Sequence, residues 1–190
     1  MIYKRITIAL LVLAAILTVS LLYFQPLIIN VKGISMEPEI EEGDWALIFR
    51  NSGKPAMDDI VVFERFSSYN IKRIKGLPGG KPDFNVIPFK YRDKRDSLEL
   101  TIPHIGMNVT PNDVEYFFWK KTLVKELRKS APEEKKVRSI SKLLQSFNGY
   151  TFRENYYFML GDNLSGSVDS RTYGVIPESD IIGEFMFVIW

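Results

Sequence analysis

The sequence predicts a mainly β protein: an antiparallel β core carried on one N-terminal transmembrane helix and interrupted by a helical insertion. Three observations predict this fold class. A long apolar run stands close to the N-terminus, a series of short β-branched and apolar segments alternates with turns, and the middle of the chain has helical periodicity. Strands that follow one another closely, without crossover helices, favour antiparallel pairing.

The apolar run comprises residues 6–24, which contain no charge, no Pro and no Gly. As a helix it would be roughly 28 Å long, close to the thickness of a hydrocarbon core. The residues at its end, Leu22 to Gln25, offer no small side chains at the spacing that removal of a signal peptide needs, so we expect an uncleaved signal anchor in contact with membrane lipid. Lys4 and Arg5 precede the run. This charge distribution predicts a single-pass protein of the cell (inner or cytoplasmic) membrane, with residues 1–5 cytoplasmic and residues 25–190 extracytoplasmic.

The strand signals lie on both sides of the insertion. They are apolar or β-branched runs bounded by turn residues, among which the Gly76–Gly80 turn is the clearest. The predicted strands cover residues 27–31, 45–49, 59–66, 69–75, 98–102, 156–160 and 181–190.

Residues 81–154 form the predicted insertion, with two helices at about 111–147. Pro111 follows the N-cap candidate Thr110, and Ser130 to Glu133 is a capping box that opens the second helix. Asn148 and Gly149 are a stop signal. The Lys- and Arg-rich faces of these helices are expected to be solvated, with contact to anionic lipid head groups as the alternative.

Composition excludes several classes of function. A net charge of +2 over 190 residues gives no support for nucleic-acid binding. The chain has no cysteine, which excludes disulfides, thiol nucleophiles, Cys-ligated zinc and iron–sulfur clusters, and its one histidine excludes a histidine-rich metal site. We therefore expect neither a metal nor an organic cofactor. The composition does not indicate an oligomeric state.

Ser35 is the candidate nucleophile. It stands between Gly33, which frees the backbone, and Pro38, which restricts it. These residue types also make ordinary turns, and a bare serine in a loop is more often a turn residue than a nucleophile. A nucleophile needs a base, and nothing around His104 resembles a triad partner.

Lysine can serve as the base when burial disfavours its charged form. Lys72 lies within a short apolar strand, unlike most other lysines of the chain. Strand alternation places Lys72 on the face opposite Ile71 and Arg73. Periodicity alone does not show that it is buried.

Three segments together resemble the type I signal peptidases (leader peptidases), which are membrane-anchored Ser–Lys endopeptidases. Residues 33–38 resemble the nucleophile box, residues 72–79 the general-base box, and residues 161–174 the C-terminal box of that family. The resemblance covers residues 1–79 and about 155–190. Three boxes in the right order behind an anchor form a specific signal.

The resemblance implies that Ser35 is the nucleophile and Lys72 its general base. It also implies that Ser167 holds the Lys72 amine by a hydrogen bond, and that Asp169 and Arg171 form an ion pair that braces the loop.

Further positions of the same boxes have weaker implications. Asp162 and Asn163 match a structural turn. Gly33 occupies the position where part of the family has a serine that supplies the second oxyanion donor. Leu164 stands where the family usually has Arg, which removes a charged group near the site.

The implied activity is removal of N-terminal signal peptides from exported preproteins, which would be the protein partners. The family cuts after small residues at positions −1 and −3. We expect the strand segments near Ile34, Met36 and Ile71 to line the pockets that receive these small residues.

Three alternatives stay open. A dedicated maturation peptidase of the same fold, acting on pilin or secretion-system substrates, would differ mainly in its substrate. The self-cleaving SOS-type proteins share the Ser–Lys β fold but lack a membrane anchor, which residues 6–24 disfavour. A non-catalytic, membrane-tethered β domain that binds exported chains is the alternative of a different class.

Overall fold

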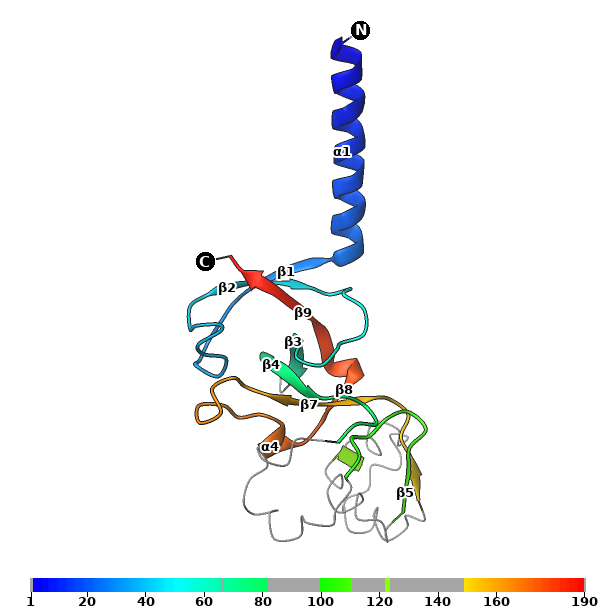
Figure 1. Cartoon of the computed structure of the whole chain (residues 1–190), viewed down its shortest axis with the longest axis vertical. Coiled ribbons are helices and arrows are strands. Elements are labelled where there is room, and N and C mark those ends of the chain that lie inside the picture. The colour runs from blue at the N-terminus through cyan, green and yellow to red at the C-terminus, as the bar shows by residue number, and fades with distance from the viewer. Residues whose placement is uncertain (1, 66, 82–99, 111–121, 124–148, 190) are drawn as a thin grey trace.

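A long helix, α1 (Ile2–Phe24), projects from a β domain (Figure 1). The computed structural model describes residues 2–65, 67–81, 100–110, 122–123 and 149–189. No residue of α1 is buried, and the helix is long and apolar enough to cross a membrane. It includes the whole of the predicted span 6–24.

The end of α1 is fixed to the β domain. The carbonyl oxygen of Phe24 accepts hydrogen bonds from the backbone N–H of Arg50 at 3.0 Å and of Asn51 at 3.4 Å. The Phe24 ring also stacks on Phe49, with 4.9 Å between ring centroids. The anchor therefore meets the domain at a defined junction.

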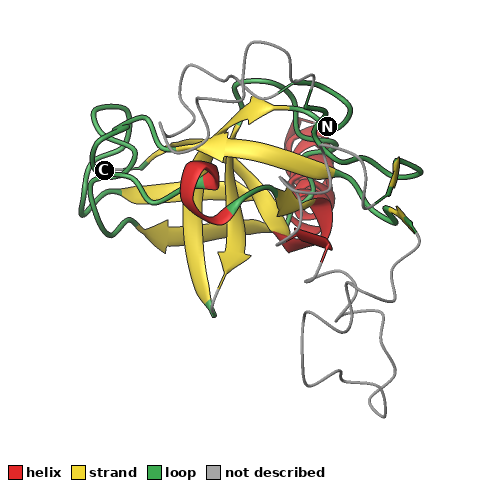
Figure 2. Cartoon of the chain, turned by 90° about the horizontal axis from the view of Figure 1, so that it is seen from below, coloured by secondary structure: helices red, strands yellow, loops and turns green. Residues whose placement is uncertain are grey.

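The β domain is built on one seven-stranded sheet with the strand order β1-β2-β9-β3-β4-β7-β8, and every pairing in it is antiparallel. Figure 2 shows its strands crossing at steep angles, so the sheet is strongly coiled. The strands are β1 (Pro26–Asn30), β2 (Trp45–Phe49), β3 (Ile60–Arg65), β4 (Ser68–Gly76), β7 (Tyr156–Leu160), β8 (Ile176–Pro177) and β9 (Ile181–Val188).

The sequence located six of these strands, and the antiparallel prediction is confirmed. The short strand β8 and the short helices α4 (Ser170–Tyr173) and η4 (Glu178–Asp180) were not predicted. Each has four residues or fewer, too few for a periodic pattern to show.

The strand predicted at residues 98–102 is wrong for its described part, residues 100–102, which has no regular secondary structure. Ile102 is fully buried because it packs against the turn after β4. Its carbonyl accepts from the Gly79 N–H at 2.9 Å, and its own N–H donates to the Gly80 carbonyl at 2.8 Å. The two predicted helices lie outside the described residues, apart from the helical pair Thr122–Leu123.

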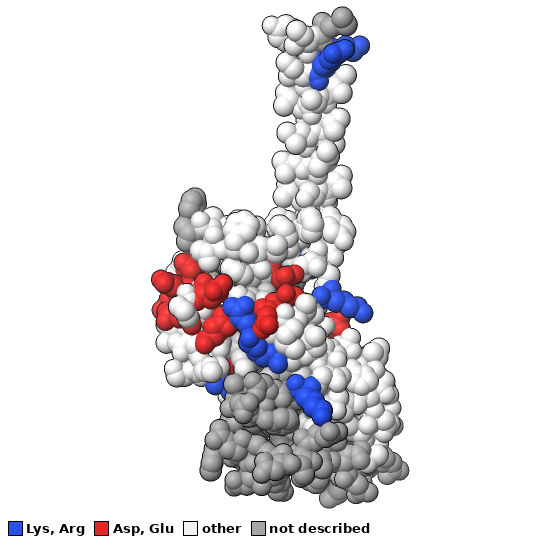
Figure 3. All heavy atoms as spheres, in the orientation of Figure 1, with Lys and Arg blue, Asp and Glu red and all other residues white. Residues whose placement is uncertain are grey.

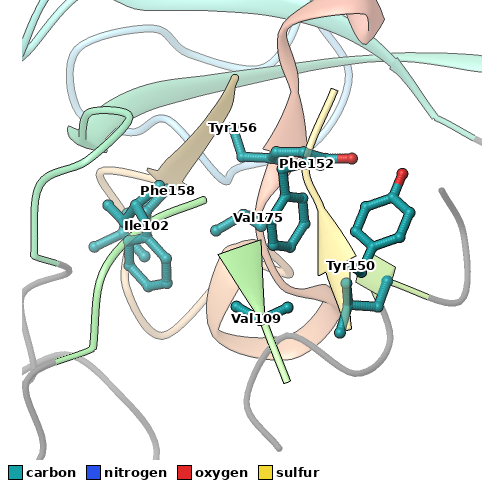
Figure 4. Close-up of a cluster of buried hydrophobic side chains, with 9 residues drawn as sticks. Ile102, Val109, Tyr150, Phe152, Tyr156, Phe158 and Val175 are labelled. Carbon is teal, nitrogen blue, oxygen red and sulfur yellow. The ribbon is translucent and has the colours of Figure 1, made fainter. Parts of the chain in front are cut away.

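A second hydrophobic core joins the described parts of the insertion to the main sheet (Figure 4). It includes Ile102 and Val109 from one side and Phe158 of β7 from the other. A small two-stranded sheet, β5 (Asn108–Val109) with β6 (Tyr150–Thr151), lies beside it. The described parts of the insertion thus pack onto β7 and extend the domain away from the anchor.

Candidate active site

Ser35 lies in a closed loop that connects β1 to β2. The loop is tied at its base, where the N–H of Val31 donates to the carbonyl of Asp44 at 2.8 Å and the N–H of Gly43 donates to the carbonyl of Val31 at 2.9 Å. Met36 and Ile40 are buried inside it. These contacts hold the loop in one shape and leave the Ser35 side chain half-buried beside the sheet.

Lys72 of β4 contacts Ser35 directly, although the two residues are 37 positions apart in the sequence. Its Nζ lies 2.7 Å from Ser35 Oγ and 2.7 Å from the carbonyl oxygen of Ile71. Lys72 is only 4 % exposed. Burial lowers the pKa of Lys72 to about 8, while the carboxylates of Asp169 and Asp162 act in the opposite direction. A useful fraction of this amine is therefore neutral near physiological pH.

Asp169 and Arg171 form a two-pronged ion pair behind the dyad. Arg171 Nε donates to Asp169 Oδ1 and Nη2 donates to Oδ2, both at 2.8 Å. Burial of the Asp169 carboxyl would raise its pKa, but the hydrogen bonds from Arg171 and from the Gly161 N–H outweigh this effect and hold the pKa below its ordinary value. Asp169 is thus a fully buried carboxylate that stays charged.

The loop that Arg171 braces does not depend on a charged side chain at position 164. Arg171 Nη2 donates to the backbone carbonyl of Leu164 at 2.7 Å and to that of Ser167 at 3.3 Å. The Leu164 side chain itself is exposed. A backbone oxygen therefore accepts from the guanidinium here, and the Asp169–Arg171 ion pair is intact with leucine at position 164.

Ser167 does not make the hydrogen bond expected of it. Its Oγ is buried and has no hydrogen-bond partner among the described residues, because the Lys72 amine is directed at Ser35 and at the Ile71 carbonyl. The hydroxyl lies close enough to the Asp169 carboxylate to help lower the pKa of that group, without the geometry of a hydrogen bond.

Gly161 brings this loop against the nucleophile. A Cβ atom at position 161 would overlap Ser167 Oγ and the carbonyl oxygen of Ser35. Only glycine permits this approach. Its role in spacing was not predicted, because a glycine before an Asp-Asn pair also fits an ordinary turn.

Asp162 and Asn163 do more than form the predicted turn. Asp162 forms a two-pronged ion pair with Arg73, whose Nε donates to Oδ1 at 2.8 Å and whose Nη2 donates to Oδ2 at 2.7 Å. Asn163 donates from Nδ2 to the Ile34 carbonyl and from its backbone N–H to the Ser35 carbonyl, each at 3.1 Å. Sequence reasoning missed the partner of Arg73, although alternation had placed Arg73 opposite Lys72.

A cleft of about 310 Å³ opens beside the Ser–Lys pair. Segments 29–32 and 68–72 line it together with Ser35 and Met36, so two of the predicted substrate residues, Met36 and Ile71, lie there and Ile34 does not. β1 is an edge strand, and β7 pairs with β4 only from residue 73 onward. Two strand edges without a partner strand among the described residues therefore border the cleft, a shape that accepts an extended peptide.

The backbone around Ser35 offers one clear oxyanion donor. The Ser35 N–H has no hydrogen-bond partner within the described part of the chain. The N–H of Gly33 is taken up by Glu42 Oε1 at 3.0 Å, so this group does not fill the gap left by the absent side chain. A hydroxyl, a buried amine within reach and a free N–H together suit acyl transfer through a serine.

Comparison with known proteins agrees with this chemistry. The family model described as "Signal peptidase, peptidase S26" matches residues 2–87 and 90–190. This match covers most of the segment 81–154 as well, although the resemblance expected from the three boxes did not extend to it.

Two sets of relatives are similar along most of the chain. "Signal peptidase I" of Buchnera aphidicola is 26% identical over 81% of this chain and 66% of its own length. "Signal peptidase IB" of Staphylococcus aureus is 25% identical over 85% of this chain and 76% of its own length.

Proposed function

Because the chain belongs to the signal peptidase family, peptidase S26, we propose that it is a membrane-bound serine endopeptidase that removes N-terminal signal peptides from exported preproteins. In this proposal Ser35 is the nucleophile and Lys72 the general base. One observation carries it: the buried Lys72 amine, with its pKa lowered to about 8, lies 2.7 Å from Ser35 Oγ.

The reaction follows from this contact. Neutral Lys72 accepts the Ser35 proton as Oγ attacks the scissile carbonyl, and the Ser35 N–H stabilises the oxyanion. The resulting ammonium then protonates the leaving amine, which frees the mature chain. Lys72 next activates a water molecule that hydrolyses the acyl-enzyme and releases the signal peptide.

The groups behind the dyad have positioning roles in this proposal. The Asp169–Arg171 ion pair holds the loop 161–171 against the nucleophile. Ser167 is the group available to orient the Lys72 amine during turnover, because its buried hydroxyl has no hydrogen-bond partner among the described residues.

The substrate would bind as an extended strand between the free edges of β1 and β4. The names of the relatives, signal peptidase I and IB, support preproteins as the substrates of this chain. The family resemblance supports small residues at positions −1 and −3 before the cleaved bond.

The proposed location is the cytoplasmic membrane, with the N-terminus inside and the β domain outside. Lys4 and Arg5 at the start of α1 support this orientation. In the face shown in Figure 3, the part of the domain next to the anchor carries no charged side chains, whereas charges gather further away. This distribution suits a domain that lies close to the lipid surface.

Cleavage of a preprotein with an Ala-x-Ala site tests the proposal, using the full chain in detergent or liposomes. Ser35→Ala and Lys72→Ala should each abolish processing. Lys75→Ala is the matched control, because Lys75 lies on the same strand but pairs with Asp58 at an exposed position, and it should retain activity. Equal processing by the parent, Ser35→Ala and Lys72→Ala would refute the dyad. A folded parent that binds but never cleaves the preprotein would favour the non-catalytic alternative.

A further inference from the structure

We propose that Asn163 is a positioning residue of the oxyanion hole. By holding the carbonyl of Ile34, its side chain fixes the peptide plane that carries the Ser35 N–H and turns that N–H into the cleft. The inference rests on the proposed function, because it assumes that Ser35 is the nucleophile. Asn163 thereby has a chemical task beyond the turn for which its sequence position is typical.

The Asn163 amide is itself held in one orientation. Its Oδ1 accepts hydrogen bonds from Ser165 Oγ and from the Gly166 N–H, both at 3.0 Å. Nδ2 must then face the other way, where it donates to the Ile34 carbonyl at 3.1 Å. The backbone N–H of Asn163 adds a bond to the next carbonyl, that of Ser35, at 3.1 Å. One residue thus holds two successive carbonyls of the nucleophile loop.

The geometry of the peptide bond converts this contact into an aim for the Ser35 N–H. The Ile34–Ser35 peptide is trans, and in a planar trans peptide the C=O and N–H point in opposite directions. Ser35 lines the cleft and Asn163 does not. Because the Ile34 carbonyl is held on the side of Asn163, the Ser35 N–H points toward the cleft. No described residue accepts a hydrogen bond from this N–H.

The turn around Ser35 does not supply this restraint by itself. The other described donor to the Ile34 carbonyl is the Glu37 N–H, at the longer distance of 3.3 Å. Gly33 lacks the side chain that could serve as a second oxyanion donor. The Ser35 N–H is then the one clear donor to the oxyanion, so its direction matters more than it would beside a second donor. Stabilisation of the transition state depends on donors that are already aligned.

Asn163→Asp tests the inference with little change in shape. The carboxylate can still accept from Ser165 and Gly166, but it has no N–H for the Ile34 carbonyl and repels that oxygen. Complete loss of an oxyanion donor lowers kcat by about 10²–10³-fold, so a donor that is only misaligned should lower it by about 10–100-fold, with KM within about two-fold. Affinity for a peptide aldehyde, which forms a tetrahedral oxyanion on Ser35, should fall by the same factor as kcat/KM.

Asn155→Asp is the matched control. Asn155 also donates from Nδ2, to Glu178 Oε2 at 2.8 Å, and accepts at Oδ1 from the Ile105 N–H at 3.1 Å, but it does not line the cleft. This variant should lose stability and keep its kcat and its aldehyde affinity. A purely structural role of Asn163 would make the two variants alike, and that result would overturn the inference.

The outcomes separate the two proposals. Cleavage that survives Ser35→Ala would overturn both. Loss of cleavage in Ser35→Ala, combined with unchanged kcat and aldehyde affinity in Asn163→Asp, would overturn the role of Asn163 alone. Should Asn163→Asp fail to fold, Asn163→Ala removes the donor without adding a charge, and the same criteria apply to it.

Discussion

Lys72 is a buried cation whose position serves catalysis at the expense of stability. A fall of its pKa from 10.5 to about 8 corresponds to a penalty of about 3 kcal/mol when the amine is charged. Below pH 8 the amine is protonated in both the folded and the unfolded chain, so the penalty is fully present. As the pH rises from about 8 to 10.5, the folded state has already lost the proton while the unfolded state still binds it. The folded state should therefore gain stability over this interval.

Replacement of Lys72 by Met should stabilise the protein while abolishing activity. Met has a similar length and no charge to desolvate, so the free energy of unfolding at pH 7 should rise by about 1–3 kcal/mol. Urea unfolding of the full chain in detergent measures it, with Lys75→Met, at an exposed ion pair, as the control that shows no gain. A Lys72→Met protein that is less stable than the parent at pH 7, or an advantage that does not shrink toward pH 10.5, would contradict this account.

The pH dependence of cleavage should follow the same amine. Only neutral Lys72 can accept the Ser35 proton, so kcat/KM should rise with pH and level off above about 8. The Asp162 carboxylate raises the pKa of Lys72, and Asp162→Asn removes that charge and leaves the nearby Arg73 unpaired. Both changes disfavour the protonated amine, so the rise should move to lower pH. A pH–rate profile of the two proteins checks the sign, and a move to higher pH would exclude Lys72 as the titrating base.

At the scale of elements, the site is the contact between two loops that are far apart in sequence. The loop between β1 and β2 carries Ser35, and the loop after β7 carries Gly161 and Asn163, which contact the Ser35 backbone. β4 lies between them and presents Lys72 to one loop and Arg73 to the other. The geometry of the dyad therefore depends on how closely these two loops approach.

Gly161→Ala should separate the loops. The new Cβ atom would overlap both Ser167 Oγ and the Ser35 carbonyl, so the nucleophile loop must shift. A displacement of about 1 Å at a reacting group can lower the rate by about 10²-fold, and we expect a loss of that order in kcat/KM for a preprotein. Gly80→Ala is the comparison, because a Cβ there would meet only Leu77, whose carbonyl oxygen at 3.1 Å needs to shift by a few tenths of an ångström, and the residue lies on the turn after β4. Equal activity of the two variants would show that the loop approach does not control the reaction.

The sequence predicted those elements whose pattern is local. The β-branched run of β3, whose first four residues are buried, and the long uncharged run of α1 were recognised because an unbroken apolar stretch is visible in the sequence itself. The strand predicted at residues 98–102 was wrong at 100–102, because an alternation of apolar residues also fits a segment that packs against a turn.

The site was predicted in part, for a related reason. Strand alternation gives the face on which Lys72 lies but not its depth in the fold, which sequence-distant groups decide. The ion pair between Arg73 and Asp162, 89 positions apart, and the grip of Asn163 on Ile34, 129 positions apart, depend on the tertiary structure and leave no periodic signal.

At the scale of the whole molecule, an apolar face of the sheet adjoins the foot of the anchor. Ile28 of β1, Leu47 of β2 and Phe187 of β9 lie in one cross-strand row, and Trp45 shares their face. Ile28 is 54 % exposed, Phe187 55 % and Trp45 45 %. α1 ends against the same strand, β2, through its contact with Phe49. This face is therefore expected to rest on the lipid surface and to bring the cleft to the level at which a signal peptide leaves the membrane.

Phe187→Glu and Ile28→Glu should separate membrane-bound from soluble substrates. A carboxylate on this face opposes contact with lipid, so processing of a preprotein in proteoliposomes should fall by about ten-fold for a loss of about 1.4 kcal/mol. Cleavage of a short soluble peptide in detergent should not change, because neither residue lines the cleft. Ile105→Glu is the control, since Ile105 is 62 % exposed in the segment 100–110, at the end of the domain far from the anchor (Figure 1). Equal effects on both substrates would mean that the substitutions disturb the fold, and no effect in proteoliposomes would mean that α1 alone positions the enzyme.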